Sequence, residues 1–573
     1  MSTIAFDKNL KKEGEKRKIL LIGLDGASPI LIEKWTKQNK LPNFKRIMED
    51  GVYGRVKSTI PPITAPAWST FMTGKNPGKH GVYDFIKREE KSYSLTVTNP
   101  GTREGETLWE IIGEQGLKVG VFNIPLTYPA TEVNGFMVTG MPHPAVQTFP
   151  HSLKEELDRV VGGYETFIAE LDAEQNPEPF LEGLYLLTSK MYKAVRYLMK
   201  KYDWNFFCMN FSGTDWIQHK MWHYMDPSHP KHKKVLWNKY GNAILNYYQK
   251  MDQIIGELLE VIDENKVVLI FSDHGFGKAK KFIHVNNFLK DIGVLKLKND
   301  FRTLLKRSLF NIGFTPSRMY KLSMKMPMRQ RTREIAYNII GGKKLRAHML
   351  NILKRMFLSF SDVDWKRTTA YSIGHIGQIY VNLKGREPSG IVTPGREYEK
   401  VREYIVKNLK SLQDPETGER IIEKIYMNEE IYKGKYKDKG ADICFISKDL
   451  QYLGFGDLEF ASKDTIEDCF GFTGNHRVEG ILILNGNEIS SQKKLNDSSL
   501  EDIAPTVLYY LGIPIPNDMD GRVLKEAFEK EFLKKNPITF VNVSKKERKP
   551  EIGFSEEEEI MIKNRLRKLG YIA

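Results

Sequence analysis

Side chains with metal-binding chemistry stand where several apolar runs of this sequence end. They are three aspartates and three histidines: Asp25, Asp215, His219, Asp273, His274 and His476. The runs KILLIGLDG, NFFCMNFSGTD and KVVLIFSDHG each close on one of the aspartates. A turn-forming role explains any single aspartate. Three such endings, two of them followed closely by a histidine, instead indicate one shared site.

The ligand types predict which metals would bind. Asp215 and His219 are four residues apart and would share one face of a helix, whereas Asp273 and His274 are adjacent. Carboxylates and imidazoles without thiolates suit a catalytic zinc, manganese or iron ion. Because the whole set is too large for one tetrahedral ion, we expect two divalent ions, with zinc favoured over Mn or Fe. Two ions about 3.5–4 Å apart are typical of phosphoryl transfer.

Thr64 is the candidate nucleophile. It lies in STIPPITAPAWSTFMTG, where Pro61, Pro62 and Pro66 stiffen the chain around its hydroxyl. A neighbouring metal ion would activate that hydroxyl for attack. The alternative is that Thr64 merely caps a helix beginning at Ala65. The two roles are compatible, because such a helix would direct its N-terminal N–H groups at a bound phosphate.

A sheet is needed to bring these residues together. Further apolar runs, KVGVFNIP, GQIYVNL, ADICFIS and GILILNG, are typical of buried strands, and helix-like stretches separate them. The alternation predicts an α/β fold with a doubly wound, mostly parallel central sheet and helices on both faces. Ligands bind beyond the carboxyl ends of such strands, which is where the aspartates fall.

Composition narrows the class of protein. The 573 residues are 41% apolar and 28% charged, which allows a sizeable core. The three cysteines have no CxxC spacing, so neither a disulfide framework nor a thiolate zinc site is expected. The N-terminus is polar, and no apolar run reaches the roughly 18 residues of a membrane span. We therefore expect a cytoplasmic protein, with peripheral membrane contact left open.

The net charge of +15 is concentrated in one segment. Residues 301–367 contain 16 lysines and arginines but only three acids. We expect a catalytic domain over residues 17–527, a basic helical insertion over 296–368, and a charged tail with a short helix over 528–573. The insertion is interpreted as a plain lid, as a cap for a large anionic substrate, or as a contact with an anionic membrane. Nucleic acid is disfavoured, because few aromatic residues lie among the bases.

The ordered set of motifs resembles the type I phosphodiesterase/nucleotide pyrophosphatase family of the alkaline phosphatase superfamily. The resemblance runs from about Lys18 to Val523 and includes TGKNPGKHG and DIAPTVLYYLGIPIPNDMDGRVL. It implies an alkaline phosphatase-like domain with two metal sites and a threonine nucleophile. By this resemblance one ion is held by Asp215, His219 and His476, and the other by Asp25, Asp273 and His274, with the Thr64 hydroxyl bridging toward it as a further ligand.

One position departs from that family. Nucleotide pyrophosphatases carry an asparagine 21 residues after the nucleophile, where it donates a hydrogen bond to a phosphate oxygen, and this chain has Phe85 there. Lys75 or Lys79 is a candidate replacement, although loop lysines are usually solvated. A sulfatase is disfavoured, because the C/S-x-P-x-R pattern is missing. Phosphatases and mutases that use serine are disfavoured as well.

The sequence favours a metal-dependent phosphodiesterase or nucleotide pyrophosphatase acting on a small phosphodiester or pyrophosphate. A phosphomonoesterase or phosphotransferase of the same superfamily is the alternative, and a non-catalytic protein that binds anionic surfaces is the third. Among the other histidines, His80 is expected to hold its loop, whereas His284 and His375 are open between structural and substrate-binding roles. The natural substrate and the oligomeric state stay open.

Overall fold

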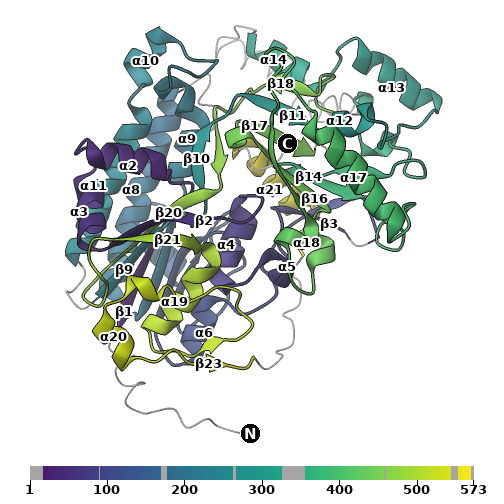
Figure 1. Cartoon of the computed structure of the whole chain (residues 1–573). Coiled ribbons are helices and arrows are strands. Elements are labelled where there is room, and N and C mark those ends of the chain that lie inside the picture. The colour runs from purple at the N-terminus through teal and green to yellow at the C-terminus, as the bar shows by residue number, and fades with distance from the viewer. Residues whose placement is uncertain are drawn as a thin grey trace.

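The computed structural model describes residues 17–89, 91–168, 177–261, 266–325, 355–456, 460–543 and 553–569. Its centre is a nine-stranded sheet with the order β21-β2-β20-β9-β1-β8-β5-β6-β7 (Figure 1). The strands are β21 (Lys493–Ser499), β2 (Val52–Lys57), β20 (Glu479–Asn485), β9 (Lys266–Phe271), β1 (Lys18–Leu24), β8 (Phe206–Phe211), β5 (Val119–Ile124), β6 (Gly135–Thr139) and β7 (Thr148–Phe149).

The central sheet is mostly parallel, as the sequence predicts. The run β9-β1-β8-β5-β6 is parallel throughout. β20, the GILILNG run, is antiparallel to both β9 and β2. β7, at the other edge, is antiparallel to β6. The sheet is therefore parallel in its middle and mixed toward both edges, and the chain has an α/β fold.

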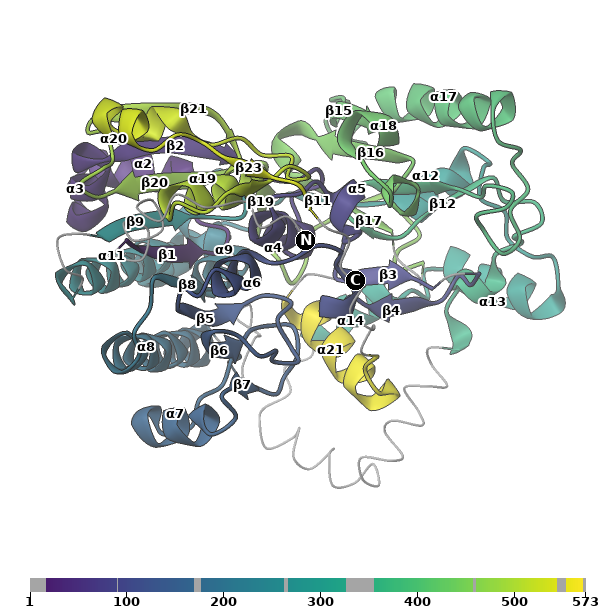
Figure 2. The ribbon, with the colours of Figure 1, turned by 90° about the horizontal axis from the view of Figure 1, so that it is seen from below.

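Helices cover both faces of this sheet. Leu20 and Ile22 of β1 pack in one apolar cluster with α2 (Pro29–Lys37), α8 (Pro177–Lys201) and α11 (Ala243–Val261). Ile19 and Leu21 point the other way, toward α4 (Thr64–Thr73), α6 (Leu108–Glu114) and α19 (Ile503–Tyr510). Figure 2 shows α8 and α11 on one side of the strands and α4, α6 and α19 on the other.

Two strand runs lie outside the central sheet, which corrects their expected place. β14 (Gln378–Val381) and β16 (Ile443–Ser447) belong to a four-stranded sheet with β12 (Ala370–Ser372) and β15 (Ile422–Met427), in the order β12-β14-β16-β15. All of its pairings are antiparallel. Ile379 and Ile443 on this sheet belong to an apolar cluster of their own. These strands are buried on both faces, so their sequences are continuous apolar runs like those of the central strands.

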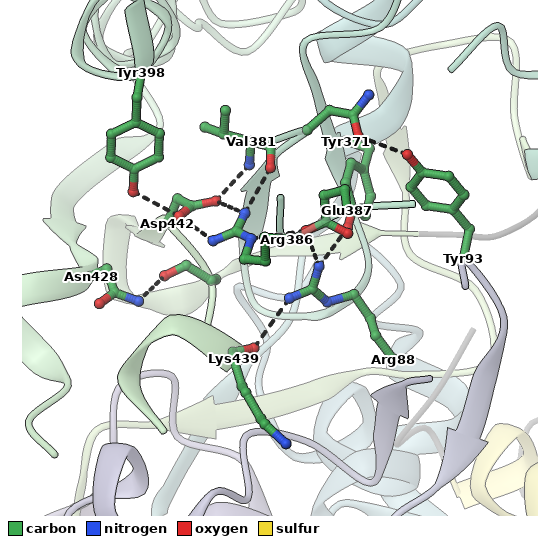
Figure 3. A network of polar contacts seen from close by, with 12 residues as sticks. Arg88, Tyr93, Tyr371, Val381, Arg386, Glu387, Tyr398, Asn428, Lys439 and Asp442 are labelled. Atoms are coloured by element: carbon green, nitrogen blue, oxygen red, sulfur yellow. Dashed lines mark hydrogen bonds and ion pairs between the residues drawn. The ribbon is translucent and has the colours of Figure 1, made fainter. Parts of the chain in front are cut away.

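A buried polar network joins this second sheet to the hairpin β3 (Ile86–Arg88) and β4 (Leu95–Val97) (Figure 3). Arg386 donates to both carboxylate oxygens of Asp442, at 2.8 and 2.6 Å. Arg88 of the hairpin forms an ion pair with Glu387. Since two guanidinium groups face two carboxylates, the network is balanced in charge and fixes the hairpin against the second sheet.

The basic segment begins with two described helices, α13 (Phe301–Asn311) and α14 (Pro316–Lys325), whereas residues 326–354 lie outside the described part of the chain. The two ends of the segment lie side by side. The amide of Lys298 donates to the carbonyl of Asp362 at 2.9 Å, and that of Asp364 donates to Lys296 at 2.8 Å. The chain therefore leaves and rejoins the body at neighbouring points.

The C-terminal helix α21 (Glu556–Leu569) buries Ile562 and Leu566 in the same apolar cluster as Leu20 of β1. It is also tied to β4, because Nζ of Lys563 donates to the carbonyl of Leu95 at 2.7 Å. Within the described ranges, no helix has both the length and the apolar character needed to cross a lipid bilayer.

Candidate active site

The three strand-end aspartates lie together because their strands are neighbours. β9, β1 and β8 are consecutive in the central sheet. Asp25 directly follows β1, Asp273 lies just beyond β9, and Asp215 is in the first turn of α9 (Gly213–Met225), which follows β8. All three side chains are fully buried. The edge predicted from the sequence is thus a buried pocket of carboxylates.

Asp215 meets two histidines. Nε2 of His219, one helical turn further along α9, lies 3.4 Å from Oδ1 of Asp215, and Nε2 of His476 lies 3.4 Å from the same oxygen. The two Nε2 atoms are 3.1 Å apart. These three residues are the first set expected from the sequence, and their three atoms lie within 3.4 Å of one another.

The second expected set is equally close. Nε2 of His274 lies 3.3 Å from Oδ2 of Asp273 and 3.7 Å from Oδ1 of Asp25. Ligand atoms of Asp25, Asp273 and His274 all lie within 4.8 Å of one another, and so do ligand atoms of Asp215, His274 and His476. His274 is therefore within reach of both centres, whereas the division made from the sequence assigns it to only one of them.

Each of the three histidines is oriented by its other ring nitrogen. Nδ1 of His219 lies 3.0 Å from the carbonyl of Gly474, Nδ1 of His274 lies 3.1 Å from that of Gly275, and Nδ1 of His476 lies 2.8 Å from that of Pro62. A carbonyl only accepts, so each Nδ1 carries the proton and each Nε2 presents its lone pair. This arrangement is typical of metal-binding histidines.

Burial and mutual repulsion shift the pKa values of the ionisable groups in this pocket. Burial, together with Asp273 and Asp215, raises the pKa of Asp25 well above its usual value. Burial and the nearby Asp215 raise the pKa of Asp273 to about 7. Burial lowers the pKa of His219 and of His274, which keeps both imidazoles neutral.

These residues fit divalent cations. Both carboxylate oxygens of Asp25 and Oδ2 of Asp273 are buried and accept no hydrogen bond from the described residues. Buried carboxylates without donors are costly unless a positive charge is present. Neutral imidazoles and clustered carboxylates are the ligands that zinc and manganese prefer.

Thr64 lies at the edge of the same cluster, at the start of α4. Its Oγ1 is 3.2 Å from Nε2 of His274. The helix begins at Thr64 itself, with Ile63 in the capping position, so the expectation of a capping threonine before Ala65 is wrong. The hydroxyl faces the imidazole instead of its own backbone. Every residue of α4 is buried, which explains the unusually apolar sequence around Thr64.

The lysines considered as replacements at the Phe85 position are occupied elsewhere. Nζ of Lys75 forms an ion pair with Asp518, and Nζ of Lys79 lies 2.7 Å from Oδ1 of Asp520. Phe85 itself is fully buried. The loop after Thr64 therefore directs no free lysine at the pocket from these two positions.

Two of the other histidines have structural partners. Nε2 of His80 lies 3.0 Å from Oγ1 of Thr70, and its Nδ1 accepts from the amide of Val82 at 3.2 Å. Nε2 of His284 lies 3.3 Å from Oε2 of Glu467. His80 therefore holds the loop that follows α4, and His284 joins β11 (Lys281–His284) to β18 (Ile466–Asp468).

A cavity opens beside the cluster. Its lining includes His219, His476, Asn475 and His375, together with apolar residues such as Ile63. Asp84 supports this wall, because its Oδ2 accepts from the amide of His375 at 3.1 Å. Sequence reasoning missed Asp84, and the segment GVYDF contains no signal for its role.

Comparison with known proteins gives the family. A sequence model described as type I phosphodiesterase / nucleotide pyrophosphatase matches residues 19–475. Ectonucleotide pyrophosphatase/phosphodiesterase family member 3 of Bos taurus is 28% identical over 114 residues, which are 19% of this chain and 13% of that protein. Venom phosphodiesterase of Macrovipera lebetinus is 27% identical over 126 residues, 21% of this chain and 14% of that protein. Both matches span a small part of the relatives' length.

Solved structures resemble the chain at low identity. Phosphonoacetate hydrolase from Sinorhizobium meliloti 1021, in complex with phosphonoformate, superposes with a TM-score of 0.48 and 14% identity, over 87% of this chain and 95% of that one. Human ectonucleotide pyrophosphatase / phosphodiesterase 5 gives a TM-score of 0.46 and 12% identity, over 91% and 99%. The family model covers most of the chain, and the chain therefore belongs to the type I phosphodiesterase / nucleotide pyrophosphatase family.

Proposed function

We propose that this protein is a metal-dependent phosphodiesterase or pyrophosphatase with Thr64 as its nucleophile. One observation carries the proposal: the Thr64 hydroxyl lies 3.2 Å from His274 at the edge of a buried cluster of aspartates and histidines. Family membership supports the hydrolase class. The proposed catalytic domain covers residues 17–527, with residues 296–368 as an insertion and residues 528–573 as a tail.

We assign one ion to Asp215, His219 and His476 and the other to Asp25, Asp273 and His274, with zinc favoured. Bound there, two ions would neutralise charge on the phosphoryl oxygens and lower the pKa of a neighbouring hydroxyl. The chain's own contribution is to hold the ligands in place. The carbonyl contacts of the three Nδ1 atoms fix the imidazoles, and the buried α4 fixes Thr64.

The proposed reaction has two steps. Oγ of Thr64 bonds to phosphorus while the bond from phosphorus to the leaving oxygen breaks, and the leaving group departs with a proton. This gives a threonine-phosphate ester on the chain. Water then attacks the same phosphorus, the bond to Oγ breaks, and Thr64 regains its hydroxyl proton. Divalent ions would be needed in both steps, but no redox reagent would.

The test is hydrolysis by the whole 573-residue chain loaded with zinc or manganese. We expect bis-p-nitrophenyl phosphate to be cleaved faster than p-nitrophenyl phosphate, and nucleotide or sugar pyrophosphates to be cleaved as well. Faster cleavage of the monoester would favour the phosphomonoesterase alternative. A metal-loaded protein without activity on any of these would exclude the proposal in favour of a non-catalytic member.

A second proposal concerns α13, which we infer lies on an anionic lipid surface. Phe301, Leu305 and Ile312 are 81%, 54% and 73% exposed. Phe301 and Leu305 are four residues apart and lie on one face of α13, Ile312 directly follows the helix, and Arg302 lies beside that face. An outward apolar stripe with bases beside it is typical of helices that lie in the plane of an anionic membrane. In Figure 1, α13 lies at the periphery, away from the central sheet.

A further inference from the structure

The cavity beside the metal-ligand cluster contains one histidine that the proposed mechanism does not use. The polar side chains in its lining are His219, His476, Asn475 and His375. His219 and His476 are already assigned as ligands. Nδ2 of Asn475 donates to the carbonyl of Leu450 at 2.7 Å. In His375, both ring nitrogens are without a hydrogen bond from the described residues.

His375 is buried, with 7% of its surface exposed, and neither ring nitrogen has a hydrogen-bond partner among the described residues. Its ring contacts that of Phe455 edge to face, with centroids 5.0 Å apart. Burying an imidazole without satisfying its N–H is unfavourable. A ligand in the cavity would supply the missing acceptor.

Asp84 holds the backbone that carries this imidazole. Its Oδ2 accepts from the backbone amide of His375 and from Nε2 of Gln378, both at 3.1 Å, and lies 3.6 Å from Nδ1 of His375. The carboxylate thus lies on the Nδ1 side of the ring. Nε2, on the opposite side of the ring, is left for a ligand.

The backbone around His375 is strained, which is a second and independent observation. Three residues in or next to β13 (Gly374–His375) have positive φ: Gly374 at +84°, Ile376 at +54° and Gly377 at +69°. For a β-branched residue such as Ile376, this conformation is an outlier. A Cβ on Gly374 would come within 2.6 Å of Oδ2 of Asp84. Strain of this kind persists where the surroundings hold it, and it is frequent at ligand-binding sites.

We propose that His375 contacts the substrate, donating a hydrogen bond from its imidazole to a phosphoryl oxygen, with Asp84 as the positioning residue. The inference rests on the proposed function, since it takes the cavity to be the substrate site. Phe85 offers no polar group there, and Lys75 and Lys79 are held by Asp518 and Asp520. His375 therefore supplies the donor that the loop after Thr64 does not.

The experiment compares His375→Ala, His375→Gln and the control His284→Ala in the metal-loaded 573-residue chain. His284 is a similarly buried histidine on β11, but it pairs with Glu467 and does not line the cavity. Three quantities are measured: metal content, the Kd for inorganic phosphate by calorimetry, and kcat/KM for bis-p-nitrophenyl phosphate. Phosphate binding supplies a readout that does not need turnover.

We expect His375→Ala to lower kcat/KM by about 10²-fold, the usual effect of losing one donor to a developing oxyanion. It should also weaken phosphate binding and leave metal content unchanged. His375→Gln keeps an N–H and should recover part of both losses, and His284→Ala should behave as wild type. Asp84→Asn should weaken phosphate binding less than His375→Ala does. In the double variant, Asp84→Asn should add little to the loss of binding already caused by His375→Ala.

Two results would overturn the inference: wild-type kcat/KM and phosphate affinity in His375→Ala, or loss of metal in that variant. Failure of the proposed function has a different signature. If the wild-type protein cleaves no diester but binds phosphate in a manner that depends on His375, the phosphodiesterase proposal falls and the His375 contact stands. If the wild-type protein cleaves the diester and His375→Ala does so equally well, only the His375 contact falls.

Discussion

The imidazole rings of His274 and His476 are stacked, with their centroids 3.6 Å apart and their planes 20° from parallel. The two residues come from distant segments, which β10 (Gly275–Lys278) and β19 (Gly474–Arg477) join as an antiparallel pair. Nε2 of His476 lies near Asp215, and Nε2 of His274 lies near Asp25 and Asp273. The stacked pair therefore forms the boundary between the two proposed metal centres.

This boundary leads to a prediction about metal content. Asp273→Ala and His476→Ala should each remove about one ion, from different centres, because each takes a ligand from one of the two sets. His274→Ala should lower occupancy at both centres, because His274 belongs to both groups of close ligand atoms. Metal content after dialysis, measured by mass spectrometry, tests this, with His284→Ala as the control. If Asp273→Ala lost both ions or neither, the division of ligands would be wrong.

Thr64→Ala should separate chemistry from metal binding. Removing the hydroxyl removes covalent attack, so hydrolysis of bis-p-nitrophenyl phosphate should fall by about 10³-fold or more. The aspartate and histidine ligands stay in place, so metal content should not change. Thr64→Ser keeps a hydroxyl and should retain measurable activity. Near wild-type turnover by Thr64→Ala would show that Thr64 is not the nucleophile.

His80 should make the fold sensitive to acid. Burial, with Arg103 and Lys75 nearby, lowers the pKa of His80 to about 3. The unfolded chain would protonate this imidazole near pH 6.5 while the folded chain would not, so stability falls as the pH drops from about 6.5 toward 3. The loss attributable to His80 is up to about 1.4 kcal/mol per pH unit in that window.

The measurement is the thermal midpoint as a function of pH for the wild type and for His80→Gln. The side-chain amide that this substitution introduces cannot take up a proton, so the variant should lose less stability on acidification between about pH 6 and 4. It should nevertheless be less stable than the wild type at pH 7, through weaker contacts with Thr70 and Val82. Parallel pH profiles for the two proteins would contradict the prediction.

Much of the site could be predicted from the sequence, because its ligands directly follow buried strands. A continuous apolar run ending in an aspartate is a local signal, and parallel neighbours bring such ends to one edge. The wall formed by Asp84 and His375 has no local signal, since the two residues are 291 positions apart and meet only through tertiary contacts. The strands β14 and β16 were predicted, but the sheet to which they belong was not. A strand that is buried on both faces has the same apolar sequence pattern in either sheet.

Breaking the network in Figure 3 should destabilise the protein more than neutralising it. Asp442→Ala leaves Arg386 without the carboxylate it donates to through two nitrogens, and we expect a loss of about 3–5 kcal/mol in unfolding free energy. The double variant Arg386→Met/Asp442→Leu removes both charges and should be more stable than Asp442→Ala alone. Denaturant unfolding compares them, and equal stability of the single and double variants would contradict a buried-charge penalty.

The exposed stripe of α13 gives the last prediction. The 573-residue chain should sediment with anionic vesicles and not with neutral ones. The binding should weaken as the salt concentration rises, because bases near such a surface each contribute about 1 kcal/mol that ions screen. Replacing Phe301, Leu305 and Ile312 by serine should abolish the binding, since these side chains supply the apolar burial.

The matched control replaces Val235 by serine. Its side chain is 82% exposed on α10 (Lys234–Tyr240), so the variant removes an exposed apolar residue without touching α13. It should bind anionic vesicles as the wild type does. Deleting residues 301–367 should remove binding as completely as the triple serine variant. If the wild-type protein bound no vesicles at any salt concentration, or if the triple variant bound as well as the wild type, the lipid-surface proposal for α13 would be wrong.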